Sequence, residues 1–125
     1  MKKVLRTIII LVLILALFGG GFWYFFIQSS ALPASIYASY AAFHLRHGSD
    51  ASAATYYTKA LKIEPSNTDY AIAASKAHRE DGNYTKAEYV LVSAIGNNSD
   101  NLDLYLELSK TYVEQDKLLD AERLI

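Results

Sequence analysis

The feature that most constrains the fold of this chain is an internal repeat of 34 residues. A fixed period of about 20 to 50 residues is typical of stacked structural units. The sequence therefore predicts three similar units, at about 34–67, 68–101 and 102–125, the last one incomplete. Shifting the chain by the period superposes Ala53, Ala87 and Ala121; Tyr57, Leu91 and Ile125; Tyr40, Ala74 and Leu108; and His44, His78 and Tyr112.

Each unit has the pattern of two short helices. In the middle unit, apolar and small residues recur at helical spacing on both sides of Gly82. Glycine suits the left-handed residue that ends a helix, and Asn67 and Asn101 suit N-cap positions. We therefore expect residues 36–125 to form an all-α solenoid of about two and a half helix-turn-helix repeats.

Small residues at the helix crossings let the backbones approach closely, and larger residues fill the space beside them. Applying this rule at each 34-residue interval predicts which residues pack between the helices. The predicted packing residues are Tyr40, Ala53, Tyr57, Ala60, Ala74, Ala87, Leu91, Ala94, Leu108 and Ala121.

With this spacing the chain resembles the tetratricopeptide repeat family, whose helix-turn-helix unit has 34 residues. The closest matches are ATYYTKALKIEPSN in the first unit and GNYTKAEYVLVSAI in the second. Tyr37, Ala71 and Tyr105 replace the early tryptophan of the family, and Leu91 replaces a late aromatic residue. The resemblance covers residues 34–125 and implies a concave groove, lined by the first helix of each unit, that binds a protein segment.

Mapping that groove onto this chain gives a mixed apolar and cationic surface. Lys76 and Lys110 are one period apart and should lie side by side, with Arg79 one turn from Lys76. Adjacent cations can hold an acidic peptide or a terminal carboxylate, and the alternative is a solvated charged face. The groove residues are Ile72, Lys76, Arg79, Leu106, Lys110 and Val113, with Ala38, Ala42 and Leu45 from the first unit.

The run Ile8–Ile27 has twenty residues and no charge. A helix of that length reaches roughly 30 Å, the thickness of the hydrocarbon core of a bilayer. A cleaved signal peptide is the alternative, but the bulky residues 22–26 stand where a cleavage site needs small ones. We expect a cytoplasmic tip and transmembrane signal anchor at residues 1–29, followed by a short linker at 30–35.

The distribution of cations predicts the topology of this anchor. Lys2, Lys3 and Arg6 precede the apolar run, and no Lys or Arg follows until Arg46. The positive-inside rule then places the N-terminus in the cytoplasm. We expect a single-pass protein of the cell (cytoplasmic or inner) membrane, with its repeats on the extracytoplasmic side.

Composition excludes several function classes. Residues 30–125 hold 9 basic and 13 acidic residues, a net charge of −4, which disfavours nucleic acid as a ligand. The chain has no cysteine and no phosphate-loop or hydrolase motif. His44 and His47 are three residues apart, but we interpret His44 as a packing residue because His78 repeats it. No enzyme activity, metal site or cofactor is expected.

Two functions remain open. The first is a membrane-anchored scaffold for protein binding; membrane-anchored tetratricopeptide proteins are often associated with envelope assembly or secretion. The second is a structural subunit held in a membrane complex through its transmembrane helix. The third unit ends on apolar Leu124 and Ile125, without the polar cap of a repeat array. This predicts a fragment, or an end that docks on a partner or a second copy.

Overall fold

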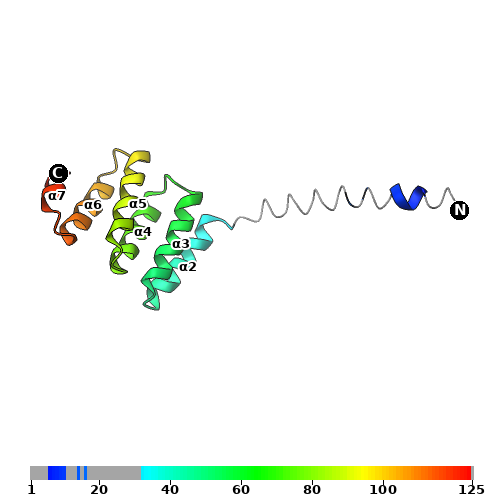
Figure 1. The fold of residues 1–125 in the computed structure, drawn as a ribbon, viewed down its shortest axis with the longest axis horizontal. Coiled ribbons are helices and arrows are strands. Elements are labelled where there is room, and N and C mark those ends of the chain that lie inside the picture. The colour runs from blue at the N-terminus through cyan, green and yellow to red at the C-terminus, as the bar shows by residue number, and fades with distance from the viewer. Residues whose placement is uncertain (1–5, 11–13, 15, 17–31, 125) are drawn as a thin grey trace. The chain divides into compact units, whose positions relative to one another are not determined.

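The structure is a computed structural model that describes residues 6–10, 14, 16 and 32–124 (Figure 1). The chain divides into two units, Met1–Leu32 and Pro33–Ile125. In the first unit residues 6–10, 14 and 16 are helical and Leu32 is not. Most of the predicted membrane-spanning run 8–27 lies outside the described residues. Among those that are described, no helix is long and apolar enough to cross a membrane.

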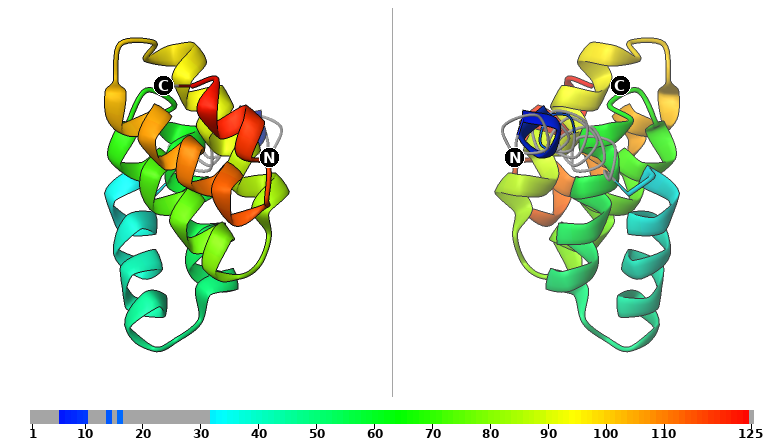
Figure 2. Two further views of the ribbon diagram at one scale, coloured as in Figure 1. Left: turned by 90° about the vertical axis from the view of Figure 1, so that its left-hand side faces the viewer. Right: turned by 90° about the vertical axis from the view of Figure 1, so that its right-hand side faces the viewer.

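The second unit is built from helices that pack in chain order, as Figure 1 shows. Each helix contacts the next one, and α4 also contacts α6. Figure 2 shows the same stack from its two ends. The expectation of an all-α solenoid-like body is confirmed for residues 32–124. The helices are α2 (Ala34–Arg46), α3 (Asp50–Ile63), α4 (Thr68–Glu80), α5 (Tyr84–Asn97), α6 (Leu102–Glu114) and α7 (Leu118–Glu122).

The turns inside the helix pairs repeat with the period of the sequence. Gly48 and Gly82 have φ angles of +70° and +75°, so both adopt the left-handed conformation that suits a glycine at a helix end. At the next position of the period, Asp116 has φ +59° without being glycine. The third helix pair thus has the same left-handed turn, although its residue there is aspartate and not glycine.

Asparagine side chains begin three of the helices. The Oδ1 atoms of Asn67 and Asn101 accept hydrogen bonds from the backbone N–H groups of Tyr70 and Asp103, at 3.1 and 3.0 Å. Both predicted N-caps are therefore confirmed. Asn83 makes the same type of bond at the start of α5. Each cap satisfies a backbone donor that the helix itself leaves unpaired.

The first helix begins at residue 34, where the sequence places the start of the first unit. α2 starts at Ala34, inside the predicted linker 30–35. Pro33 precedes it with φ −57°, an angle already compatible with a helix, and Pro33 O accepts a hydrogen bond from Ile36 N at 3.0 Å. Pro33 thus stands directly before the first helical residue.

The core lies where the helix pairs meet. The larger buried cluster joins α4, α5 and α6 and consists of Ala71, Ala74, Val90, Leu91, Ala94, Leu104 and Leu108. A smaller cluster of Ala53, Ala54 and Ala77 joins α3 to α4. Most of the packing positions expected from the sequence are buried, namely Ala53, Ala60, Ala74, Ala87, Leu91, Ala94, Leu108 and Ala121, and Tyr57 is half-buried against the larger cluster.

Tyr40 differs from this expectation. Its residue is 52% exposed, whereas Ala74 and Leu108, one and two periods later, are buried. Both belong to the larger cluster, where Leu108 meets residues of α4 and α5, the helix pair that precedes it in the stack. α2 belongs to the first pair, so Tyr40 instead stacks on Tyr56 of α3, with ring centroids 5.7 Å apart.

Candidate functional site

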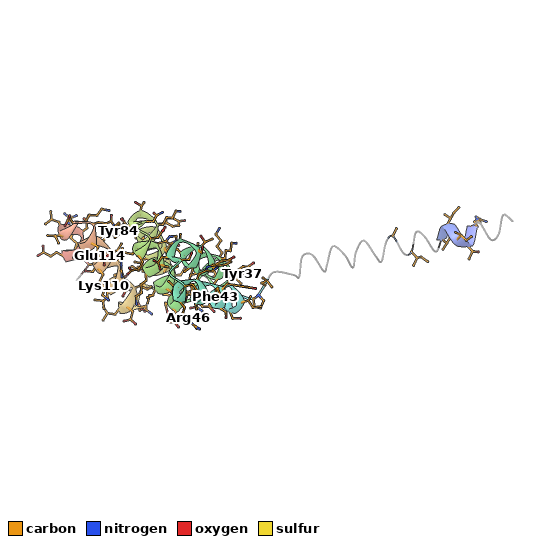
Figure 3. All side chains as sticks on the ribbon, turned by 90° about the horizontal axis from the view of Figure 1, so that it is seen from below. Tyr37, Phe43, Arg46, Tyr84, Lys110 and Glu114 are labelled. Carbon is orange, nitrogen blue, oxygen red and sulfur yellow. The ribbon has the colours of Figure 1, made fainter. Side chains whose placement is uncertain are left out.

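The predicted groove residues come from α4 and α6, which contact each other in the structure. On α6, Leu106 and Val113 are each about half exposed, at 53% and 49%. Lys76 and Lys110 keep about half of their side chains exposed, and Ile72 is half-buried against the core. Figure 3 shows the Lys110 and Glu114 side chains of α6.

A residue that sequence reasoning missed organises this surface. Glu107 of α6 is only 5% exposed. Its carboxylate accepts hydrogen bonds from Lys110 Nζ at 2.8 Å and from Arg79 Nη1 at 3.2 Å. Lys76 Nζ lies 3.8 Å from the same carboxylate. One acid therefore gathers the three predicted cations around itself.

The role expected for Arg79 changes with this finding. Its side chain is only 10% exposed, and its guanidinium pairs with Glu107 and also with Glu114, whose Oε2 lies 3.2 Å from Arg79 Nε. An arginine held in this way has little surface left for a ligand. Arg79 is thus a structural link between α4 and α6, whereas the sequence placed it among the residues that face a partner.

The environment of Glu107 favours its ionised form. Burial raises the pKa of this carboxyl, but the hydrogen bonds from Lys110 and Arg79 and the charge of Lys76 act in the opposite direction. The net result is a pKa below the ordinary value of 4.5. Glu107 is therefore negatively charged at neutral pH, and its ion pairs are complete there.

The two lysines keep room for a further acceptor. Three cations and the two carboxylates of Glu107 and Glu114 leave this cluster with a net charge of 3 − 2, or +1. Lys76 Nζ is 3.8 Å from Glu107, a distance too long for a strong hydrogen bond. The cluster thus keeps a positive charge beside two lysine side chains that are about half exposed.

An apolar stripe on α6 runs along the same surface. Leu102, Leu106 and Val113 are exposed and stand at i, i+4 and i+11, a spacing that places them on one helix face. Leu102 was not predicted, although its spacing from Leu106 was visible in the sequence. We call Ile72, Lys76, Leu102, Leu106, Lys110 and Val113 the α4–α6 surface.

The first helix pair contributes less to such a groove than expected. Ala38 and Ala42 are half-buried, and Leu45 is 39% exposed. Two cavities of the second unit lie elsewhere. One of about 480 Å³ is formed by the α4–α5 turn and the α6–α7 turn. Another, of about 500 Å³, lies beside α2 and α3.

The histidines occupy packing and turn positions. His78 is buried and its Nε2 lies 3.2 Å from Thr58 Oγ1, while the His44 ring stacks on Tyr56 with centroids 5.3 Å apart. His47 Nδ1 lies 2.7 Å from Phe43 O. Within the part of the chain that the structure describes, no group of three His, Asp or Glu side chains is arranged to hold a metal ion.

Comparison with known proteins found no match. The chain matches no protein-family model and no curated protein. The functional argument therefore depends on the geometry of the helical unit and on the sequence pattern.

Proposed function

We propose that this chain is a membrane-anchored scaffold that binds a protein segment on the α4–α6 surface. The observation that carries the proposal is the exposure of Leu106 and Val113 on a helix whose opposite face is packed into the core. Exposed apolar side chains beside charged groups are typical of surfaces that bind other proteins. The 34-residue period supports an assignment to the tetratricopeptide class of scaffolds.

The surface suits a segment with apolar side chains and an acidic group. The apolar side chains would pack along Leu102, Leu106 and Val113. The acidic group would approach Lys76 and Lys110, because about half of each side chain is exposed and a hydrogen bond to Glu107 holds Lys110 in place. Preorganised cations lose less side-chain entropy on binding than free ones.

The anchor is the second part of the proposal. The uncharged run Ile8–Ile27 has the length of a membrane span, and the cations before it favour an N-terminus in the cytoplasm. The helical unit would then face the extracytoplasmic side. Tethering holds the scaffold and a membrane-bound partner in one thin layer, which raises their effective concentration.

Site-specific cross-linking in membranes tests the scaffold. A photo-reactive amino acid replaces Leu106 in the full chain, and a second variant carries it at Val92, an exposed position on α5. We expect a partner to be captured from position 106 and not from position 92. Equal capture from both positions would contradict a specific surface.

Charge variants sharpen the same experiment. Lys76→Ala/Lys110→Ala should lower capture from position 106 severalfold, while the matched pair Lys62→Ala/Lys86→Ala, which removes two exposed lysines of α3 and α5, should not. Replacing Ile8–Ile27 by an unrelated membrane anchor should preserve capture. Loss of capture on that exchange would indicate instead a subunit held through its transmembrane helix.

A further inference from the structure

The first helix pair carries an exposed aromatic face that the proposed function does not use. Ile36, Tyr40 and Phe43 stand at i, i+4 and i+7 on α2 and are 38%, 52% and 53% exposed. Together with Ser39, His44 and Tyr56 they line the cavity of about 500 Å³. We call these six residues the α2 face.

The period of the sequence shows that this side of the helix is normally covered. One period later, Ala74 and Ala77 occupy the places of Tyr40 and Phe43, and both are buried. Two periods later, Leu104, Leu108 and Thr111 are buried at the places of Ile36, Tyr40 and Phe43. Ala77 clusters with Ala53 and Ala54 of α3, and Leu104 and Leu108 cluster with residues of α4 and α5, so the preceding helix pair covers these three positions. In α2 the corresponding residues are large and exposed.

The helix that carries the α2 face has basic but no acidic side chains. α2 contains no acidic residue, and no acid occurs in the sequence before Asp50. Arg46 lies in the last turn of α2, three residues after Phe43. Lys59 Nζ of α3 lies 5.2 Å from the centroid of the Tyr56 ring. The surroundings of the face therefore complement an anionic surface.

The chain length between the proposed anchor and α2 is short. Six residues separate Ile27 from Ala34. At about 3.4 Å per residue even an extended chain spans only roughly 25 Å over this distance. A helix tethered so closely meets the headgroup layer at a high effective concentration, so a small apolar face suffices to hold it there.

We propose that the α2 face docks on the headgroup region of the bilayer that holds the anchor. Tyrosine rings are enriched at that depth, because their bodies are apolar and their hydroxyl groups stay hydrated. Ile36 and Phe43 would reach the acyl-chain boundary, while Arg46 and Lys59 would pair with lipid phosphates. The docking rests on the proposed membrane anchor and would aim the α4–α6 surface in a fixed direction.

The experiment uses the full chain in nanodiscs of zwitterionic and anionic phospholipids. The sequence has no cysteine, so a single introduced one carries a fluorophore selectively. Ser39→Cys reports on the α2 face, and Ser93→Cys, an exposed serine of α5, is the matched control. A third variant, Ala16→Cys, reports on the anchor. Spin-labelled lipids quench a fluorophore that lies at the depth of the spin label.

We expect headgroup-labelled lipids to quench the Ser39→Cys fluorophore at least twofold more than that at Ser93→Cys. Adding Ile36→Ser and Phe43→Ser should abolish the difference while circular dichroism stays unchanged, since both side chains are exposed. Adding Arg46→Glu and Lys59→Glu should reduce it in anionic nanodiscs.

Three outcomes would overturn the docking. Equal, weak quenching at positions 39 and 93 with strong acyl-chain quenching at position 16 would leave the anchor intact and reject the docking alone. Lack of quenching at position 16 would reject the anchor of the proposed function as well. Protection of position 39 from aqueous iodide that depends on the number of chains per nanodisc would assign the face to a second copy.

Discussion

The carboxylate of Glu107 lies 3.2 Å from the guanidinium of Arg79 and joins α6 to α4. Both side chains are nearly buried, at 6% and 10% exposure. The pair therefore connects the second and third helix pairs beneath the α4–α6 surface. Because Lys76 and Lys110 also approach Glu107, this one acid both links the two helices and lies next to the exposed lysines.

Glu107→Gln should lower the free energy of unfolding of the helical unit by about 2 kcal/mol, because it leaves Arg79 largely buried with a weaker acceptor. Urea unfolding of the full chain in mild detergent, followed by circular dichroism, measures this. Glu114→Gln is the control: its carboxylate is 45% exposed, so the loss should stay within about 0.5 kcal/mol. Equal losses for both variants would contradict a central role for Glu107.

Acid should weaken the same ion pairs. The folded chain holds the pKa of Glu107 below the ordinary value of 4.5, so the unfolded chain takes up a proton first as the pH falls. The stabilisation from Glu107 is complete above about pH 4.5 and is lost as the pH drops through the lower, folded pKa. The unfolding midpoints of the parent and of Glu107→Gln should therefore approach each other as the pH falls below about 4.5, and a constant difference over that range would contradict this assignment.

His78 should produce a second pH dependence at higher pH. Burial and the charge of Lys86 lower its pKa from 6.5, against a smaller opposing effect of Asp81. Below about pH 6.5 the unfolded chain binds a proton that the folded chain still excludes, so stability falls with pH until His78 itself is protonated. Urea unfolding between pH 7.5 and 5 should show a smaller fall for His78→Gln. NMR titration of the His78 ring gives the folded pKa directly, and a value above 6.5 would contradict the prediction.

Local features of this fold could be predicted from the sequence. Glycine at positions 48 and 82 and asparagine at positions 67 and 101 act on their own turns, so each specifies a helix end without knowledge of the neighbours. The alanines of the packing positions likewise follow from the period. Residue type alone does not predict the turn at Asp116, because only the 34-residue period indicates a left-handed conformation there.

The candidate site could be predicted only in part. The resemblance to the tetratricopeptide family placed Lys76, Leu106 and Lys110 on a groove, and the period placed the two lysines side by side. The link between Glu107 and Arg79 spans 28 residues and depends on how α4 crosses α6, which no local pattern contains. The i,i+3 spacing of Glu107 and Lys110 was visible, but such pairs are common on exposed helices.

Substitutions at two left-handed turns should change the free energy of unfolding in opposite directions. Gly82 has φ +75°, and a Cβ atom there would meet nothing within 4 Å, so Gly82→Ala isolates the backbone cost of about 1 kcal/mol. Asp116 already bears a similar cost at φ +59°, so Asp116→Gly should raise the free energy of unfolding by up to about 1 kcal/mol. Urea midpoints give both values. Changes of the same sign would show that side-chain contacts outweigh the backbone at one of the turns.

The last prediction compares two residues that share one place in the repeat. Leu104 is 0% exposed and Ile36, two periods earlier, is 38% exposed. Leu104→Ala should cost about 2 to 5 kcal/mol, because the larger cluster is left with a cavity next to Leu108 and Leu91. Ile36→Ala should cost less than about 1 kcal/mol in detergent, since no cavity forms on an open face. A cost for Ile36→Ala as large as that for Leu104→Ala would mean that the α2 face is already covered within the purified protein, and the bilayer would then not be its partner.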